Sequence, residues 1–220
     1  MNEKEVLERI RRDYDQVADL YDDMVRESDA VIDALPKAMI TAFADIIRAS
    51  GSAGDVLDAG CGPGQWTDHL DRAGIRAYGI DLSPAMVAIA RRYRPDLRYE
   101  VGSMAQLEAR DGAVAGVLAN FSLIHTPPDL LPSVLAEFAR VIEPGGPLLI
   151  GAQITDTAEG HDWVHYDHRA SPAYLWTLDA LADRLRKHDF TELGRLRLVA
   201  PAPGKPPGGY LLTTRNPRDN

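Results

Sequence analysis

The segment VLDAGCGPGQW at residues 56–66 constrains the fold most, because it places glycines between a short apolar run and a helical pattern. Gly60, Gly62 and Gly64 allow the positive φ angles of a tight turn and let a ligand approach the main chain closely. The N-terminus of the following helix offers unpaired N–H groups. A strand, a glycine loop and a helix in this order predict a binding site for a nucleotide-like ligand.

From Asp55 onward, short apolar runs alternate with helical stretches, which predicts a parallel sheet. The last two runs flank the Pro/Gly-rich segment 201–208, so we expect them to form an antiparallel pair at one edge. The expected strands are DVLDA, IRAYGI, LRYEV, AVAGVLAN, PLLIGAQ, TELGRLRLVA and GYLLTTR. Helices are expected near 64–73, 83–93, 129–142 and 177–188, after two N-terminal helices within residues 3–50. We expect residues 1–50 to form a helical cap and residues 51–220 the main domain.

The composition favours a small-molecule partner. With 24 Lys and Arg against 33 Asp and Glu, the net charge of −9 disfavours nucleic acid as a partner. The single cysteine excludes an intramolecular disulfide and favours the cytoplasm. No apolar run approaches the roughly 20 residues of a membrane helix, so we expect no membrane association. The oligomeric state stays open between monomer and homodimer.

Asp81 ends the second expected strand, about 20 residues beyond the glycines, where a doubly wound fold places a carboxylate on ribose hydroxyls. The dinucleotide fingerprint would require a glycine at the position of Gln65. Asp58 would repel a pyrophosphate but attract the sulfonium of S-adenosylmethionine. These residues favour S-adenosylmethionine as the cofactor, with an NAD-dependent oxidoreductase as the weaker alternative.

The motifs VLDAGCGPGQWTDHL and GIDLSPAMVAIAR together closely resemble class I S-adenosylmethionine-dependent methyltransferases of the small-molecule type. The resemblance extends to YDQVADLYDD, LRYEVGSMAQL, VLANFSLIHTPP and EFARVIEPGGPLLIG. It implies an α/β, Rossmann-like sheet of seven strands, six parallel and the last antiparallel, with helices on both faces and an N-terminal helical cap. The cofactor-binding residues that it implies are Tyr14, Tyr21, Asp58, Gly60, Cys61, Gly62, Gly64, Trp66, Asp81, Leu82, Met86, Ser103, Met104, Asn120, Phe121 and Ser122.

Histidines and aromatic residues mark the expected acceptor site. His125 follows the fourth strand in SLIHTPP, where the Pro-Pro turn would hold its ring near the transferred methyl as a general base. The segment 161–169 reads as a loop, and its His165 and His168 are the other candidate bases. No helix fixes the spacing of its three histidines, so we expect no metal. The predicted wall of the acceptor pocket consists of Trp163, Tyr166, Tyr174 and Trp176.

The resulting functional hypothesis is methyl transfer from S-adenosylmethionine to O, N or S of a small metabolite. Because the methyl group is activated by positive sulfur, the protein would mainly align the reactants, exclude water and remove a proton where the nucleophile carries one. We expect the N-terminal helices to close over the site as a lid. The alternatives are a non-catalytic S-adenosylmethionine-binding regulatory subunit and a methyltransferase acting on a macromolecule.

Overall fold

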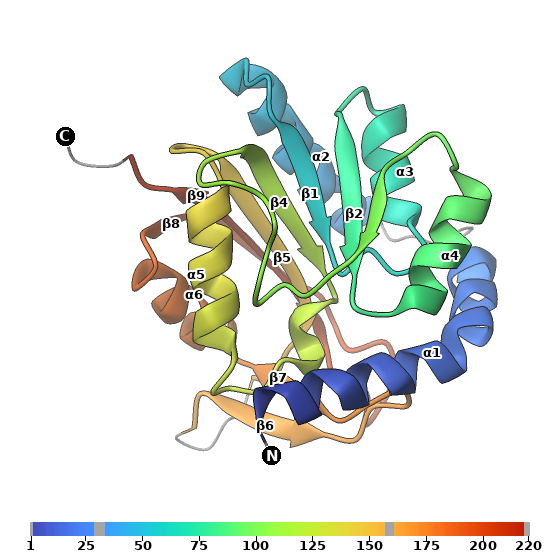
Figure 1. The fold of residues 1–220 in the computed structure, drawn as a ribbon. Coiled ribbons are helices and arrows are strands. Elements are labelled where there is room, and N and C mark those ends of the chain that lie inside the picture. The colour runs from blue at the N-terminus through green and yellow to red at the C-terminus, as the bar shows by residue number, and fades with distance from the viewer. Residues whose placement is uncertain (1, 29–33, 157–160, 218–220) are drawn as a thin grey trace.

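The computed structural model describes residues 2–28, 34–156 and 161–217. Seven strands form one sheet in the order β3-β2-β1-β4-β5-β9-β8 (Figure 1). β9 pairs antiparallel with both β5 and β8, and the other pairs are parallel, so six strands run in one direction. The predicted fold class is therefore confirmed. The strands are β1 (Asp55–Ala59), β2 (Ala77–Asp81), β3 (Tyr99–Val101), β4 (Val114–Asn120), β5 (Pro147–Gln153), β8 (Phe190–Arg197) and β9 (Gly208–Arg215).

Helices cover both faces of the sheet. The central strands β4 and β5 are buried along almost their whole length, which explains their continuous apolar sequences. One face packs against α2 (Ala34–Ser50) and α3 (Gln65–Arg72), and the other against α5 (Leu131–Val141) and α6 (Leu178–Arg186). Ser83 is the N-cap of α4 (Pro84–Tyr93), and its hydroxyl accepts a hydrogen bond from the Met86 N–H at 3.2 Å.

The two N-terminal helices have different positions. α1 (Glu3–Ser28) crosses the carboxyl ends of the parallel strands and reaches α4 (Figure 1), where Ala18 packs with Met86 and Ile89. In α2, the apolar side chains Ile40 and Phe43 are buried against the sheet. Of the expected cap, only α1 therefore lies over the strand ends, and α2 belongs to the helical layer of the sheet. None of the described helices is long and apolar enough to cross a membrane.

A second, two-stranded sheet follows β5 and differs from the predicted loop. β6 (Trp163–Tyr166) pairs antiparallel with β7 (Ala173–Trp176), and together they form a hairpin at the end of the molecule crossed by α1 (Figure 1). The stretches WVHY and AYLW consist mainly of aromatic and β-branched residues, which favour strands. The prediction of a loop at 161–169 was therefore wrong for residues 163–166.

Candidate active site

The glycine loop leaves β1 in a conformation that only glycine adopts without strain. Gly60 has φ +73°, and a Cβ at this position would lie 2.3 Å from the Cβ of Ser122. The N–H groups of Gly60 and Cys61 both donate to the carbonyl of Ile80, at 2.8 and 2.9 Å. The loop is thus held between the ends of β2 and β4, with its main chain directed at the end of the sheet.

Asp81 joins the loop to the end of β2. Its Oδ2 accepts the Gly62 N–H at 2.8 Å, and its Oδ1 accepts the Ser83 N–H at 2.8 Å. Burial raises the pKa of this carboxyl, whereas the two N–H donors lower it. Ser83 in turn donates its hydroxyl to Asp15 on α1 at 2.6 Å. The carboxylate, the loop and α1 therefore form one connected hydrogen-bonded network.

These groups border a cavity that contains about 860 Å³ of space between atoms, its mouth included. It lies between α1 and the carboxyl ends of β1, β2 and β4. Most of the residues predicted to bind the cofactor line it. They are Tyr14, Tyr21, Gly60, Gly62, Asp81, Leu82, Met86, Ser103, Met104, Asn120, Phe121 and Ser122.

Two residues at the end of β4 line the cavity and carry buried polar atoms. Oδ1 of Asn120 and Oγ of Ser122 are buried and have no hydrogen-bond partner among the described residues. Between them, Phe121 adopts φ +56°, a strained conformation for a side chain of this size, and its ring packs edge-on against Tyr210 at 6.0 Å. Buried polar atoms without partners are costly, so this arrangement suits a cavity that fills with a polar ligand.

Asp58, which the sequence predicts to contact the cofactor, does not line the cavity. Its side chain is almost completely buried and accepts a hydrogen bond from the hydroxyl of Thr67 at 2.7 Å. Burial raises the pKa of Asp58 to about 7, and the hydrogen bond from Thr67 opposes that shift. Thr67 lies in the first turn of α3, so this carboxyl connects strand and helix beneath the loop.

Cys61, Gly64 and Trp66 also lie outside the cavity lining. Cys61 is buried against Tyr99, and this burial raises the pKa of its thiol. Gly64 caps α3 with φ +86°. Trp66 packs edge-on against His69 at 5.5 Å on the outer side of the loop. Direct cofactor contact by these three residues stays a prediction.

His125 lines the cavity, but both of its ring nitrogens are engaged. The ring lies in the short 3₁₀ helix η2 (Leu123–His125). Nε2 is 2.7 Å from the hydroxyl of Tyr14, and Nδ1 is 3.0 Å from the carbonyl of Pro172. Since the carbonyl can only accept, Nδ1 carries the proton and Nε2 accepts the Tyr14 hydroxyl. Burial lowers the pKa of His125 to about 4, so the ring is neutral near pH 7.

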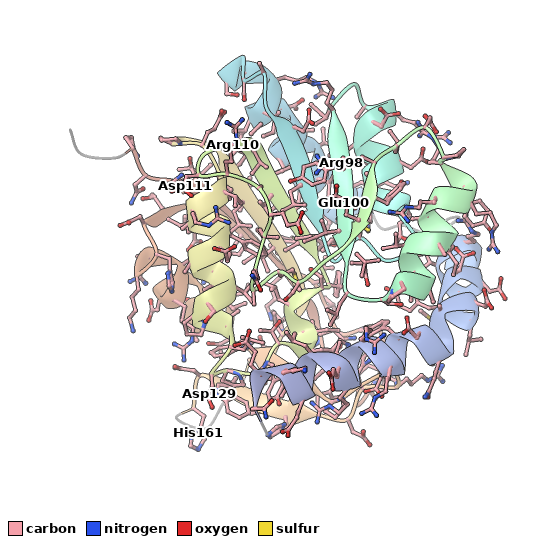
Figure 2. The ribbon with its side chains drawn as sticks, viewed as in Figure 1. Arg98, Glu100, Arg110, Asp111, Asp129 and His161 are labelled. Atoms are coloured by element: carbon pink, nitrogen blue, oxygen red, sulfur yellow. The ribbon has the colours of Figure 1, made fainter. Side chains whose placement is uncertain are left out.

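The other two candidate bases do not line the cavity. His168 lies behind His125, with ring centroids 5.1 Å apart, and burial lowers its pKa. His165 is exposed on β6 and packs against Trp163 and Tyr174. His161 lies farther out, at the edge of the molecule (Figure 2). Among the described residues, no three His, Cys, Asp or Glu side chains are grouped to hold a metal.

The aromatic wall predicted from the sequence is absent from the cavity lining. Trp163 and Tyr174 contact one another at 5.4 Å between ring centroids, and Trp176 stacks with Arg184 of α6 at 4.5 Å. Tyr166 neighbours His168 at 6.4 Å. The rings of Trp163, Tyr166, Tyr174 and Trp176 pack within and around the hairpin, and their contact with an acceptor stays a prediction.

Sequence reasoning missed the part of the lining farthest from the glycine loop. Leu7, Ile10 and Arg11 precede Tyr14 on the same stripe of α1 at helical spacing, and that periodicity could have revealed them. The start of α5 offered no comparable signal. The missed lining residues are Leu7, Ile10, Arg11, Ser83, Gly102, Ala105, Thr126, Leu130 and Val134.

The sheet order, the glycine loop and the carboxylate on β2 define a Rossmann-like domain that binds a nucleotide-derived ligand at the carboxyl ends of its strands. Residues 56–146 match a family model described as a methyltransferase domain. A solved structure of the 1,6-didemethyltoxoflavin-N1-methyltransferase of Burkholderia thailandensis, with bound 1,6-didemethyltoxoflavin and S-adenosylhomocysteine, has the same fold. Its TM-score is 0.75 at 24% identity, covering 99% of this chain and 92% of that one.

Two curated relatives show the same kinship in sequence. A demethylmenaquinone methyltransferase of Beutenbergia cavernae is 31% identical over 64% of this chain and 60% of its own length. A trans-aconitate 2-methyltransferase of Variovorax paradoxus is 35% identical over 68% of this chain and 57% of its own. The chain thus spans about three fifths of each of these relatives. In sequence and fold it is similar to class I S-adenosylmethionine-dependent methyltransferases.

Proposed function

We propose that this protein transfers a methyl group from S-adenosylmethionine to O, N or S of a small metabolite. The observation that carries the proposal is the hydrogen bond from the Gly62 N–H to Asp81, which brings the glycine loop and the ribose-type carboxylate to one cavity beneath α1. In a Rossmann-like sheet, a nucleoside occupies this position.

The residues present fit that cofactor. Asp81 would accept the ribose hydroxyls, Gly60 and Gly62 would lie beneath the methionyl group, and Ser103 and Met104 would lie against the adenine. The buried oxygens of Asn120 and Ser122 lack donors within the described protein, so they suit the ammonium and hydroxyl groups of this cofactor. The sulfonium supplies an activated methyl group, and the chain contributes alignment and exclusion of water.

The position of α1 supports a small acceptor. The helix lies across the cavity and is held there by contacts that include Tyr14 with His125 and Asp15 with Ser83, so a macromolecule would have to displace it. The names of the two curated relatives likewise refer to small molecules. We place this activity in the cytoplasm, in keeping with the single cysteine.

Calorimetry with S-adenosylhomocysteine and with NADH tests the proposal first. Micromolar binding of S-adenosylhomocysteine and weaker binding of NADH are expected, and the reverse order would refute it. Production of S-adenosylhomocysteine from S-adenosylmethionine over a panel of small acids, phenols, amines and thiols then tests turnover. Cofactor binding without turnover of any class would favour a regulatory subunit.

A further inference from the structure

One end of the cavity is left over when the proposed cofactor residues are set aside. It lies between the first turns of α1 and the start of α5 (Figure 1). We call it the acceptor end, and it is defined by Leu7, Ile10, Arg11, Thr126, Leu130 and Val134. Four of these six side chains are apolar, so an acceptor lodged here presents a hydrocarbon surface to the protein.

No titratable side chain that lines the described cavity is placed to remove a proton from an acceptor. His125 accepts the Tyr14 hydroxyl at Nε2 and donates from Nδ1 to Pro172. Tyr14 and Tyr21 are partly buried phenols, and desolvation raises the pKa of each. Asp81 accepts hydrogen bonds from two backbone N–H groups beside the glycine loop, away from the acceptor end. A nucleophile already in its reactive form at neutral pH needs none of these groups.

Arg11 is the one cationic side chain among the described residues that line the cavity. Its nearest acidic partner is Asp15, at 3.9 Å between Nη1 and Oδ2. The other oxygen of Asp15 accepts from the Ser83 hydroxyl at 2.6 Å and the Ala85 N–H at 3.3 Å, so Asp15 mainly caps α4. An ion pair this long contributes little to stability. Most of the guanidinium donors of Arg11 therefore stay available to a ligand.

We propose that the acceptor is a carboxylate on an apolar carbon skeleton, with the carboxylate held by Arg11 and the skeleton lodged against Leu7, Ile10 and Val134. This assignment rests on the proposed methyl transfer. A carboxylate oxygen forms the new O–C bond while the S–C bond of the sulfonium breaks and its electron pair stays on sulfur. The products are a methyl ester and a neutral thioether, and no proton changes place. Arg11 is thus a residue that determines acceptor specificity.

The test compares matched acids and amides in the presence of saturating S-adenosylhomocysteine. Octanoate with octanamide, and benzoate with benzamide, differ mainly in charge, and calorimetry gives the Kd of each. We expect at least one acid to bind about tenfold or more tightly than its amide, because a guanidinium–carboxylate pair is a charge-assisted bidentate contact. Arg11→Gln should abolish this preference and leave the Kd of S-adenosylhomocysteine within about twofold of the wild-type value. Arg12→Gln, which changes an exposed neighbour outside the cavity lining, is the matched control and should keep the preference.

Three results would overturn the assignment. They are equal binding of acids and amides, no binding of either acid at millimolar concentration, and an acid preference that survives Arg11→Gln. A loss of S-adenosylhomocysteine affinity in Arg11→Gln, with the acid preference intact, would assign Arg11 to the cofactor instead. Binding of S-adenosylhomocysteine is measured first for each variant. Its absence in the wild type would refute the proposed function itself, whereas its presence without an acid preference refutes only this inference.

Discussion

The hydroxyl of Tyr14 lies 2.7 Å from Nε2 of His125, although 111 positions separate the two residues in the chain. The same imidazole reaches the carbonyl of Pro172 through Nδ1 at 3.0 Å. The three residues connect α1, the turn after β4 and the segment between β6 and β7. His125, which the sequence predicts to be a general base, is therefore a residue that connects α1 to the rest of the cavity wall.

Loss of the Tyr14 hydroxyl should destabilise the protein. Tyr14→Phe leaves a buried imidazole nitrogen without a donor, and we expect the free energy of unfolding to fall by about 1–3 kcal/mol. Urea unfolding measures the change. Tyr174→Phe is the control, because a phenyl ring keeps the contacts of Tyr174 with Trp163 and His165. Equal stability of Tyr14→Phe and the wild type would show that the hydrogen bond contributes nothing.

His125 should make folding sensitive to acid. The pKa of His125 in the folded protein is about 4, below the ordinary value of roughly 6.5. Its contribution to folding stability is therefore complete above pH 6.5 and is lost as the pH falls toward 4. The unfolded chain binds the proton first in that window. The stability advantage of the wild type over His125→Gln should therefore shrink by about 2 kcal/mol between pH 7 and pH 4.5.

This comparison isolates one group. The raised pKa of Asp58 works in the opposite direction over the same pH range, but it is present in both proteins and cancels. Denaturant titrations at the two pH values give the difference directly. A gap between the two proteins that does not change with pH would mean that the imidazole titrates normally and is not shielded by burial.

Asp81 should dominate cofactor affinity. Asp81→Ala removes a charge-assisted pair of contacts to the ribose hydroxyls, which we expect to weaken S-adenosylhomocysteine binding roughly 30- to 150-fold. Asp81→Asn keeps one oxygen acceptor, so its affinity for S-adenosylhomocysteine should fall less than that of Asp81→Ala. Asp45→Ala on the exposed side of α2 serves as the control in calorimetry. Unchanged affinity in Asp81→Ala would place the ribose elsewhere.

Residues of α1 should gain protection when the cofactor site is filled. Charged side chains dominate this helix, and its contact with α4 rests on the small cluster of Ala18, Met86 and Ile89. Segments with few buried apolar contacts open at low free-energy cost. Amide hydrogen exchange with and without saturating S-adenosylhomocysteine measures the change. The reference is α2, whose buried face should keep it protected in both states. Equal exchange from α1 in the two states would contradict a lid.

The sequence determined the framework of this protein. The glycines of residues 60–64 specify a turn by their own conformational freedom, and Asp81 follows at the distance that one crossover between parallel strands requires. The alternation of apolar runs and helical stretches likewise predicted a parallel sheet, and the Pro/Gly-rich segment 201–208 predicted the antiparallel pair of β8 and β9. These signals are readable because each depends on residues close together in the chain.

Only the tertiary structure decided which side chains face the cavity. Asp58 stands beside the glycines in sequence, yet its carboxyl turns beneath the loop to Thr67. Helical spacing puts Arg11 on the same stripe as Tyr14, but only the crossing of α1 over the strand ends places that stripe at the cavity. The sequence predicts that His125 is a free base, whereas in the structure its two ring nitrogens are hydrogen-bonded to Tyr14 and Pro172. The physical reason is that these placements arise from packing between distant segments, and packing selects one of the orientations that the local sequence leaves open.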